Sequence, residues 1–300
     1  MPADIPMTVI LLVFYLVFVG QIFVISIHYP NKMIARIRYV HDTYPPADYP
    51  KLYPGKTPGA ASKSLMARLR WIGAYCKLVA VIGIAVLAYM LGNGYEPALE
   101  GGDEIFVMFY FFLQAAPFVY LAIKEYQQFS AMHDGHKSAV RSADLRPRRL
   151  FDFVHPCYFF GAVSMFVIWL AFYVWQAGDL ATWGGEVYAT LLLIAGMHVA
   201  YGLIIAQHLH GKKIDPYQAR DDQMRTIGVT INILVISSFM ISLFMLLTQM
   251  ADEFAFEVFD PVMTSFYLQL CLILGVGQTF RTVKVEDVDF EVYRADQPMP

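Results

Sequence analysis

Residues 7–27 read MTVILLVFYLVFVGQIFVISI, a run of 21 residues without one charged side chain. About 20 such residues form a helix long enough to cross the roughly 30 Å of hydrocarbon in a bilayer. Basic residues follow this run and none precedes it, which is typical of a membrane anchor with an outside N-terminus rather than a cleaved secretory signal. The run therefore predicts a first membrane-spanning helix.

The rest of the chain repeats this apolar pattern. Of the 300 residues, 57% are apolar and only 16% are charged, against about 25% charged residues in an ordinary soluble domain. We therefore expect an all-α polytopic membrane protein, a bundle of seven transmembrane helices within residues 1–280, followed by an acidic tail at 281–300. The predicted spans are about 7–27, 71–92, 105–123, 155–177, 187–207, 227–248 and 261–280.

The basic residues all fall on one side of this predicted membrane. Eight of the 22 Lys and Arg lie in the loop 28–70, six in 124–154, four in 208–226 and three in the tail, and Lys77 lies just inside the second span. Lys and Arg mark cytoplasmic loops. We therefore expect an N-terminus outside and a C-terminus in the cytoplasm, in a plasma or bacterial inner membrane. The near-neutral net charge of −3 argues against a nucleic-acid partner.

Tyrosine and proline alternate in the largest basic loop, where residues 43–55 read TYPPADYPKLYPG. A residue before proline is pushed toward extended geometry. We therefore expect an ordered, polyproline-like strap over the cytoplasmic mouth of the bundle, anchored by Tyr44, Tyr49 and Tyr53. A proline-rich ligand for a partner is the alternative. The acidic tail could dock on the basic loops as a strand or remain solvated.

One ionisable residue, His198, is expected near the middle of the fifth span. Such a residue faces the bundle interior or a cavity and is a functional candidate. Tyr201 and His208 lie on roughly the same helical face. His198 could contact a substrate, ligate haem or hydrogen-bond a neighbouring helix, but no second histidine lies at a similar depth. Small residues that would let another helix approach are Gly196, Ala200 and Gly202.

Two residues of the third span are further candidates for lining a solute path through the membrane. Pro117 lies in the span interior, where it should kink the helix and free the carbonyl of Leu113. Gln114 directly follows Leu113, and Gln269 is a similar uncharged polar residue in the seventh span. Such side chains more often join helices than bind ligands.

Histidines gather near the predicted cytoplasmic side. A metal site there would use His133, His136, His155 and His208, because imidazole suits zinc, iron or copper. Their spacing matches no established ligand motif, and solvated interfacial histidines are the favoured alternative. We therefore expect no cofactor, with a metal or haem as the less favoured options.

The absence of certain charged residues from the predicted spans narrows the range of functions. The spans contain no Asp or Glu, which disfavours an ion-coupled pump, and the seventh has no Lys for a retinal Schiff base. We favour a non-enzymatic sensor or accessory subunit whose basic loops dock a protein partner or a second copy. A transporter or channel for a small neutral or anionic solute, with a midplane site at His198 and Tyr201, is the alternative. The third hypothesis is a His-metal enzyme acting on lipid or quinone at the cytoplasmic face.

Overall fold

The structure, a computed structural model, describes residues 6–55, 57–96, 104–135, 148–211, 215–254 and 256–295, and helix is the only regular structure within them. Seven of its helical rods are long and apolar enough to span a membrane. This confirms the predicted class and the predicted number of spans. Large apolar side chains also face outward, such as Phe109, 67% exposed, and Leu192, 74% exposed, as expected for contact with lipid.

The first rod is continuous from Met7 to Thr43, and the last one from Asp260 to Thr282. The first rod consists of α1 (Met7–Gln21), η1 (Ile22–His28) and α2 (Tyr29–Thr43), and the last of α8 (Asp260–Leu272), η6 (Ile273–Gly277) and α9 (Gln278–Thr282). Both η1 and η6 are π-helical. The other rods are α3 (Pro58–Gly92), α4 (Glu104–Gly135), α5 (Pro156–Ala177), α6 (Gly185–His210) and α7 (Arg220–Glu253).

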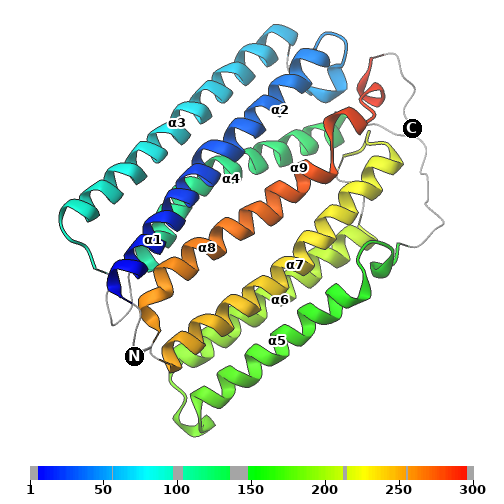
Figure 1. Cartoon of the computed structure of the whole chain (residues 1–300). Helices are drawn as coiled ribbons and strands as arrows, with labels where there is room; N and C mark the ends of the chain where they lie inside the picture. The colour runs from blue at the N-terminus through cyan, green and yellow to red at the C-terminus, as the bar shows by residue number, and fades with distance from the viewer. Residues whose placement is uncertain are drawn as a thin grey trace.

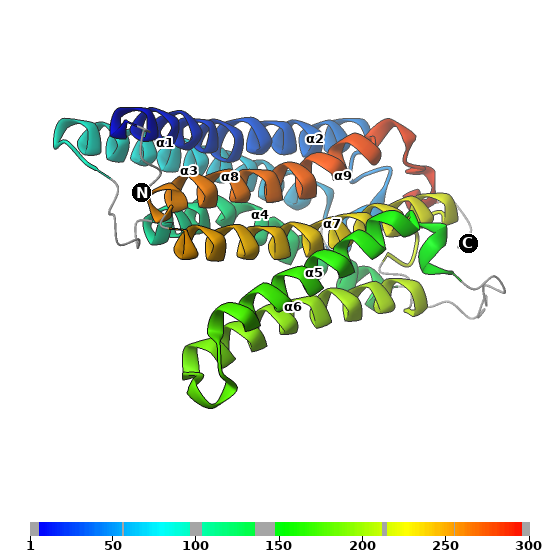
Figure 2. The same cartoon turned by 60° about the horizontal axis from the view of Figure 1, so that its bottom comes forward.

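The rods form two groups that meet at α7 and α8 (Figure 1). In the first group, the first rod packs against α3 and α8, and α4 packs against α3 and α8. In the second group, α5 and α6 both pack on α7. Figure 2 shows the α5–α6 pair diverging from the first group. The α7–α8 contact is therefore the seam of the molecule.

The two ends of the bundle differ in charge. The end that carries the N-terminus also holds the α5–α6 and α7–α8 turns (Figure 1), and we call it the acidic face. The opposite end holds the strap between α2 and α3 and the C-terminus, and we call it the basic face. Lys and Arg are absent from residues 1–31, 78–123, 150–211 and 226–280, which include every segment of the acidic face.

Helix extends further at the basic face than the apolar runs indicate. The first rod continues to Thr43 and α3 begins at Pro58, so the predicted loop 28–70 reduces to residues 44–57. Met33 of α2 packs against Ile72 and Cys76 of α3 there, and this burial supports the extra turns. Pro30 falls inside the first rod, where its ring would crowd the preceding turn, and the π-helical η1 directly precedes it.

The strap is a series of turns, so the expectation of a polyproline form is wrong. Tyr44, Tyr49 and Tyr53 have φ of −122°, −120° and −125° with ψ between 58° and 73°. These angles avoid the α region, as the following prolines require, but ψ is far from the +145° of polyproline. The backbone N–H of Tyr49 donates to the Pro45 carbonyl at 3.0 Å. Local turn hydrogen bonds outweigh the extended preference.

A close contact between α3, α4 and η1 depends on Gly83. Tyr110 of α4 donates its hydroxyl to the carbonyl of Val79 at 2.9 Å. A Cβ at Gly83 would lie 2.9 Å from Cδ1 of Ile22 and closer still to the Tyr110 hydroxyl. Only a residue without a side chain leaves room for this tyrosine.

We expect Gly83→Ala to lower the free energy of unfolding by about 1–3 kcal/mol, the usual cost of overpacking a core. The measurement is thermal or denaturant unfolding in mild detergent. Gly161→Ala on α5 is the matched control, because a Cβ there meets nothing within 4 Å. Equal stability of the two variants would contradict the packing described for Gly83.

Candidate functional site

Three buried polar side chains join three rods in the centre of the first group. Gln21 of α1 donates through Nε2 to Oε1 of Gln114 on α4 at 2.8 Å. Ser265 of α8 donates its hydroxyl to Oε1 of Gln21 at 2.5 Å. Gln21 and Ser265 are completely buried and Gln114 is 2% exposed. Gln21 is therefore the centre of a hydrogen-bonded junction between α1, α4 and α8.

Two more residues extend this polar junction. Gln114 Nε2 also donates to the hydroxyl of Ser26 in η1 at 2.9 Å. Gln269 of α8 donates to the carbonyl of Val17 at 2.9 Å, and its side chain lies close to Gly20. We use the name polar junction for these five residues, Gln21, Ser26, Gln114, Ser265 and Gln269. Its hydrogen bonds connect helices, as the sequence indicated for Gln114 and Gln269.

Both π-helical segments lie where the first rod contacts the last rod. Ile25 of η1 and Tyr29 pack against Leu272 at the end of α8. A Cβ at Gly277 of η6 would overlap the hydroxyl of Tyr29, so the two rods are in close contact here. π-Helical turns frequently mark functional positions, and no pattern in the sequence predicted either one.

Pro117 has the local effect that the sequence predicts. It is fully buried in α4. The carbonyl of Leu113, which loses its usual partner four residues ahead, accepts a hydrogen bond from the hydroxyl of Tyr75 on α3 at 2.9 Å. A neighbouring helix thus satisfies the freed group, as membrane helices require.

His198 lies between α6 and α7 with both ring nitrogens in hydrogen bonds. Nδ1 lies 2.8 Å from the Ile194 carbonyl, which only accepts, so Nδ1 carries a proton. Nε2 lies 3.0 Å from the hydroxyl of Ser242, a completely buried residue of α7. Nε2 also lies 3.3 Å from the Ser238 carbonyl, to which the Ser242 hydroxyl donates at 3.1 Å. The geometry is that of a histidine joining two helices.

Tyr201 and His208 were expected on the same helical face as His198. Of these two residues, Tyr201 lies near it. The Tyr201 ring centroid is 6.3 Å from that of His198, and the ring of Phe166 on α5 lies closer, at 4.4 Å with its plane tilted by 41°. His208 is ten residues further along α6, about 15 Å at 1.5 Å per residue, and its carbonyl accepts from Arg148 at 3.1 Å. Gln114 and Pro117 belong to the other group of helices.

The proposed metal ligands lie on separate elements. His155 precedes α5 and accepts the backbone N–H of Cys157 at 3.3 Å, His133 lies near the end of α4, and His208 lies in the last turn of α6. His136 is outside the described residues. Within the described ranges, no three His, Cys, Asp or Glu side chains are close enough to hold a metal ion.

At the basic face, the C-terminal tail packs against the strap. The Tyr44 ring stacks on Phe290 with centroids 4.1 Å apart. Tyr49 donates its hydroxyl to Glu291 at 2.8 Å, and Tyr53 donates to the Tyr44 carbonyl at 3.0 Å. The three tyrosines thus hold the tail and fold the strap on itself.

The other side of the tail contacts the segment that leads into α7. Tyr293 donates its hydroxyl to Asp215, and the backbone N–H of Asp289 donates to Asp222 at 2.9 Å. Arg225 forms an ion pair with Asp287 at 3.7 Å. We call this assembly of residues 44–53, 215–225 and 285–293 the clasp. Its apolar centre consists of Tyr217, Val285, Phe290 and Tyr293, and Met132 of α4 packs against them.

The tail docks, but not as the strand that was one expectation. Residues Val285–Asp287 and Glu291–Tyr293 form short 3-10 turns. The alternation of apolar and polar residues therefore reflects turns that direct Val285, Phe290 and Tyr293 inward. The docking partners lie about 70 to 250 residues away in sequence, so the local pattern contained no information about them.

We expect the clasp to loosen at high pH. Burial raises the pKa of Tyr53 from 10.0 to about 12, with Asp42 adding to the rise, and burial beside Asp215 also raises the pKa of Tyr293. A raised folded-state pKa means that the neutral phenols stabilise the clasp fully below about pH 10, and that this stabilisation is lost as the pH rises through about 12.

A nitroxide at Ala295→Cys, with the three native cysteines replaced, should therefore become more mobile between about pH 10 and 12 by electron paramagnetic resonance. A label at Asp179→Cys on the acidic face is the control and should not change over that interval. Unchanged mobility of the tail label up to pH 12 would contradict the role assigned to the tyrosines.

No known protein family, curated protein or solved structure matches this chain.

Proposed function

We propose that this chain is a non-enzymatic integral membrane component that docks a protein partner on its basic face. The observation that carries the proposal is the clasp, in which three segments distant in sequence form one ordered layer at a single end of the bundle. Such a layer provides a rigid surface outside the membrane. The partner can be another protein or a second copy of this chain.

Exposed residues beside the clasp suit an interface. Tyr39, 45% exposed, and the exposed Arg38 lie in the last turns of α2, directly before the strap. Tyr and Arg are enriched among residues that dominate binding energy. By contrast, His198 and the polar junction use their hydrogen bonds within the bundle. Arg38 and Tyr39, in contrast, are exposed at the basic face.

The proposal includes an orientation with the basic face in the cytoplasm and the N-terminus outside. It is supported by the distribution of Lys and Arg, which are absent from the segments that form the acidic face. A partner would then be a cytoplasmic protein or the cytoplasmic part of a membrane protein.

A solute site at His198 is a second candidate. Trp169 is fully buried in the α5–α6–α7 core, and its indole N–H has no hydrogen-bond partner within the part of the chain that the structure describes. Phe166 contacts both Trp169 and His198. An acceptor atom of a small solute would satisfy this N–H. A His198→Phe variant that leaves stability and solute flux unchanged would remove this candidate.

The test of partner docking is photo-crosslinking in living cells with benzoylphenylalanine at position 39. We expect a protein adduct of discrete mass, which Phe290→Ala should reduce because it removes the ring that stacks on Tyr44. The same photoreactive residue at position 81, where Val81 is 62% exposed on the apolar surface, should give only lipid adducts. Identical products from positions 39 and 81 would contradict the proposal.

Orientation is checked with the same cells and single-cysteine variants. An impermeant maleimide should label Asp179→Cys in intact cells and Arg38→Cys only after permeabilisation. The opposite order would reverse the assignment of the two faces.

A further inference from the structure

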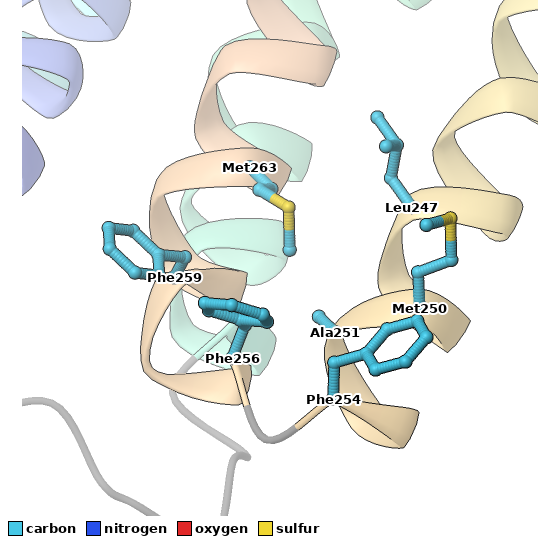
Figure 3. Close-up of a pocket in the computed structure, with 7 residues that line it drawn as sticks. All are labelled: Leu247, Met250, Ala251, Phe254, Phe256, Phe259 and Met263. Atoms are coloured by element: carbon cyan, nitrogen blue, oxygen red, sulfur yellow. The ribbon is translucent and has the colours of Figure 1, made fainter. Parts of the chain in front are cut away.

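An apolar hollow opens between the end of α7 and the start of α8 at the acidic face (Figure 3). Its volume is about 350 Å³, within the range of small-molecule sites. Every residue that lines it is apolar, and the lining residues come from both helices and from the turn between them. These residues are Leu247, Met250, Ala251, Phe254, Phe256, Phe259 and Met263.

The hollow is open to the side of the bundle. Leu247 is 43% exposed, Met250 37% and Phe254 54%. It occupies the last turns of a membrane-spanning helix, so its inner part faces hydrocarbon and its outer end approaches water. A ligand with an apolar body and a polar end fits this position. Two flexible methionines let the lining adapt to the shape of that body.

The turn that closes the outer end supplies only negative charge. Asp252, Glu253, Glu257 and Asp260 lie within it, and Glu257 falls between two lining residues, Phe256 and Phe259. No Lys or Arg occurs from residue 226 to residue 280 or in the α5–α6 turn. Glu253 accepts a long hydrogen bond, 3.5 Å, from Gln176. The potential at the mouth therefore favours a cation.

We propose that this hollow binds a lipophilic organic cation, with its apolar groups between α7 and α8 and its positive charge near Glu253 and Glu257. The rings of Phe254 and Phe256 add cation–π attraction at the mouth. The carboxylates disfavour an anionic lipid headgroup in the same place. This site is independent of partner docking at the opposite face.

The test uses tetraphenylphosphonium and tetraphenylborate, which share size and shape and differ in the sign of their charge. Equilibrium dialysis measures their binding to the full chain in nanodiscs of zwitterionic lipid, with empty nanodiscs subtracted. We expect saturable binding of one tetraphenylphosphonium per chain and no saturable binding of tetraphenylborate. Saturable binding of both ions, or of neither, would overturn the proposal.

Two variants locate the site. Leu247→Trp fills the hollow and should weaken tetraphenylphosphonium binding at least tenfold. The pair Glu253→Gln and Glu257→Gln keeps the hollow and should weaken binding about three- to tenfold, since exposed charge pairs and cation–π contacts are individually weak. The pair Asp179→Asn and Glu186→Gln is the matched control, because it removes two charges from the same face in the α5–α6 turn.

Gel filtration and thermal unfolding establish that each variant is folded. Equal affinity of the Glu253/Glu257 pair and the Asp179/Glu186 pair would overturn the role assigned to Glu253 and Glu257 in attracting the cation. Native mass spectrometry of Leu247→Trp measures whether the variant has lost a bound lipid. Loss of a bound lipid with unchanged tetraphenylphosphonium binding would identify the hollow as a lipid-tail site and overturn the proposal.

Discussion

A membrane interior offers no water to satisfy polar groups, so each one must find a partner inside the bundle. In this protein that constraint acts most strongly at Gln21, which holds Gln114 of α4 and Ser265 of α8. Lipid is as apolar as the helix surfaces, and helix association in it depends on close packing and such hydrogen bonds. The polar junction therefore fixes how α1, α4 and α8 are rotated relative to one another, and the contacts around Gly83 and Pro117 depend on that rotation.

The second group is attached to this core through one seam. α7 contacts α8 and α9, and the aromatic rings of Phe244 and Tyr267 stack across the seam with centroids 4.2 Å apart. The clasp lies at its basic end and the apolar hollow at its acidic end. Binding at either end would thus act on the same helix pair, whereas few residues of α5 and α6 are buried.

The sequence predicted those features that depend on local composition. Long apolar runs predicted the seven spans. Pro117 predicted the free carbonyl of Leu113, which accepts a hydrogen bond from Tyr75. The sequence did not predict features that depend on helix rotation or on partners distant in the chain. Gln21 and Ser265 are single polar residues in apolar runs, and only the fold shows that they meet. The stacking of Tyr44 on Phe290 joins residues that no local pattern relates, and the turn geometry of the strap follows from its hydrogen bonds.

The most direct test of this account is a double-mutant cycle between Gln21 and Gln114 in lipid bicelles, with each residue changed to Leu and the free energy of unfolding measured for all four proteins. The account predicts a favourable coupling of about 0.6–2 kcal/mol, the range for hydrogen bonds between membrane helices. It also predicts that either single change destabilises the bundle, because the remaining amide stays buried without its partner. Strictly additive effects of the two changes would contradict the central role assigned to Gln21.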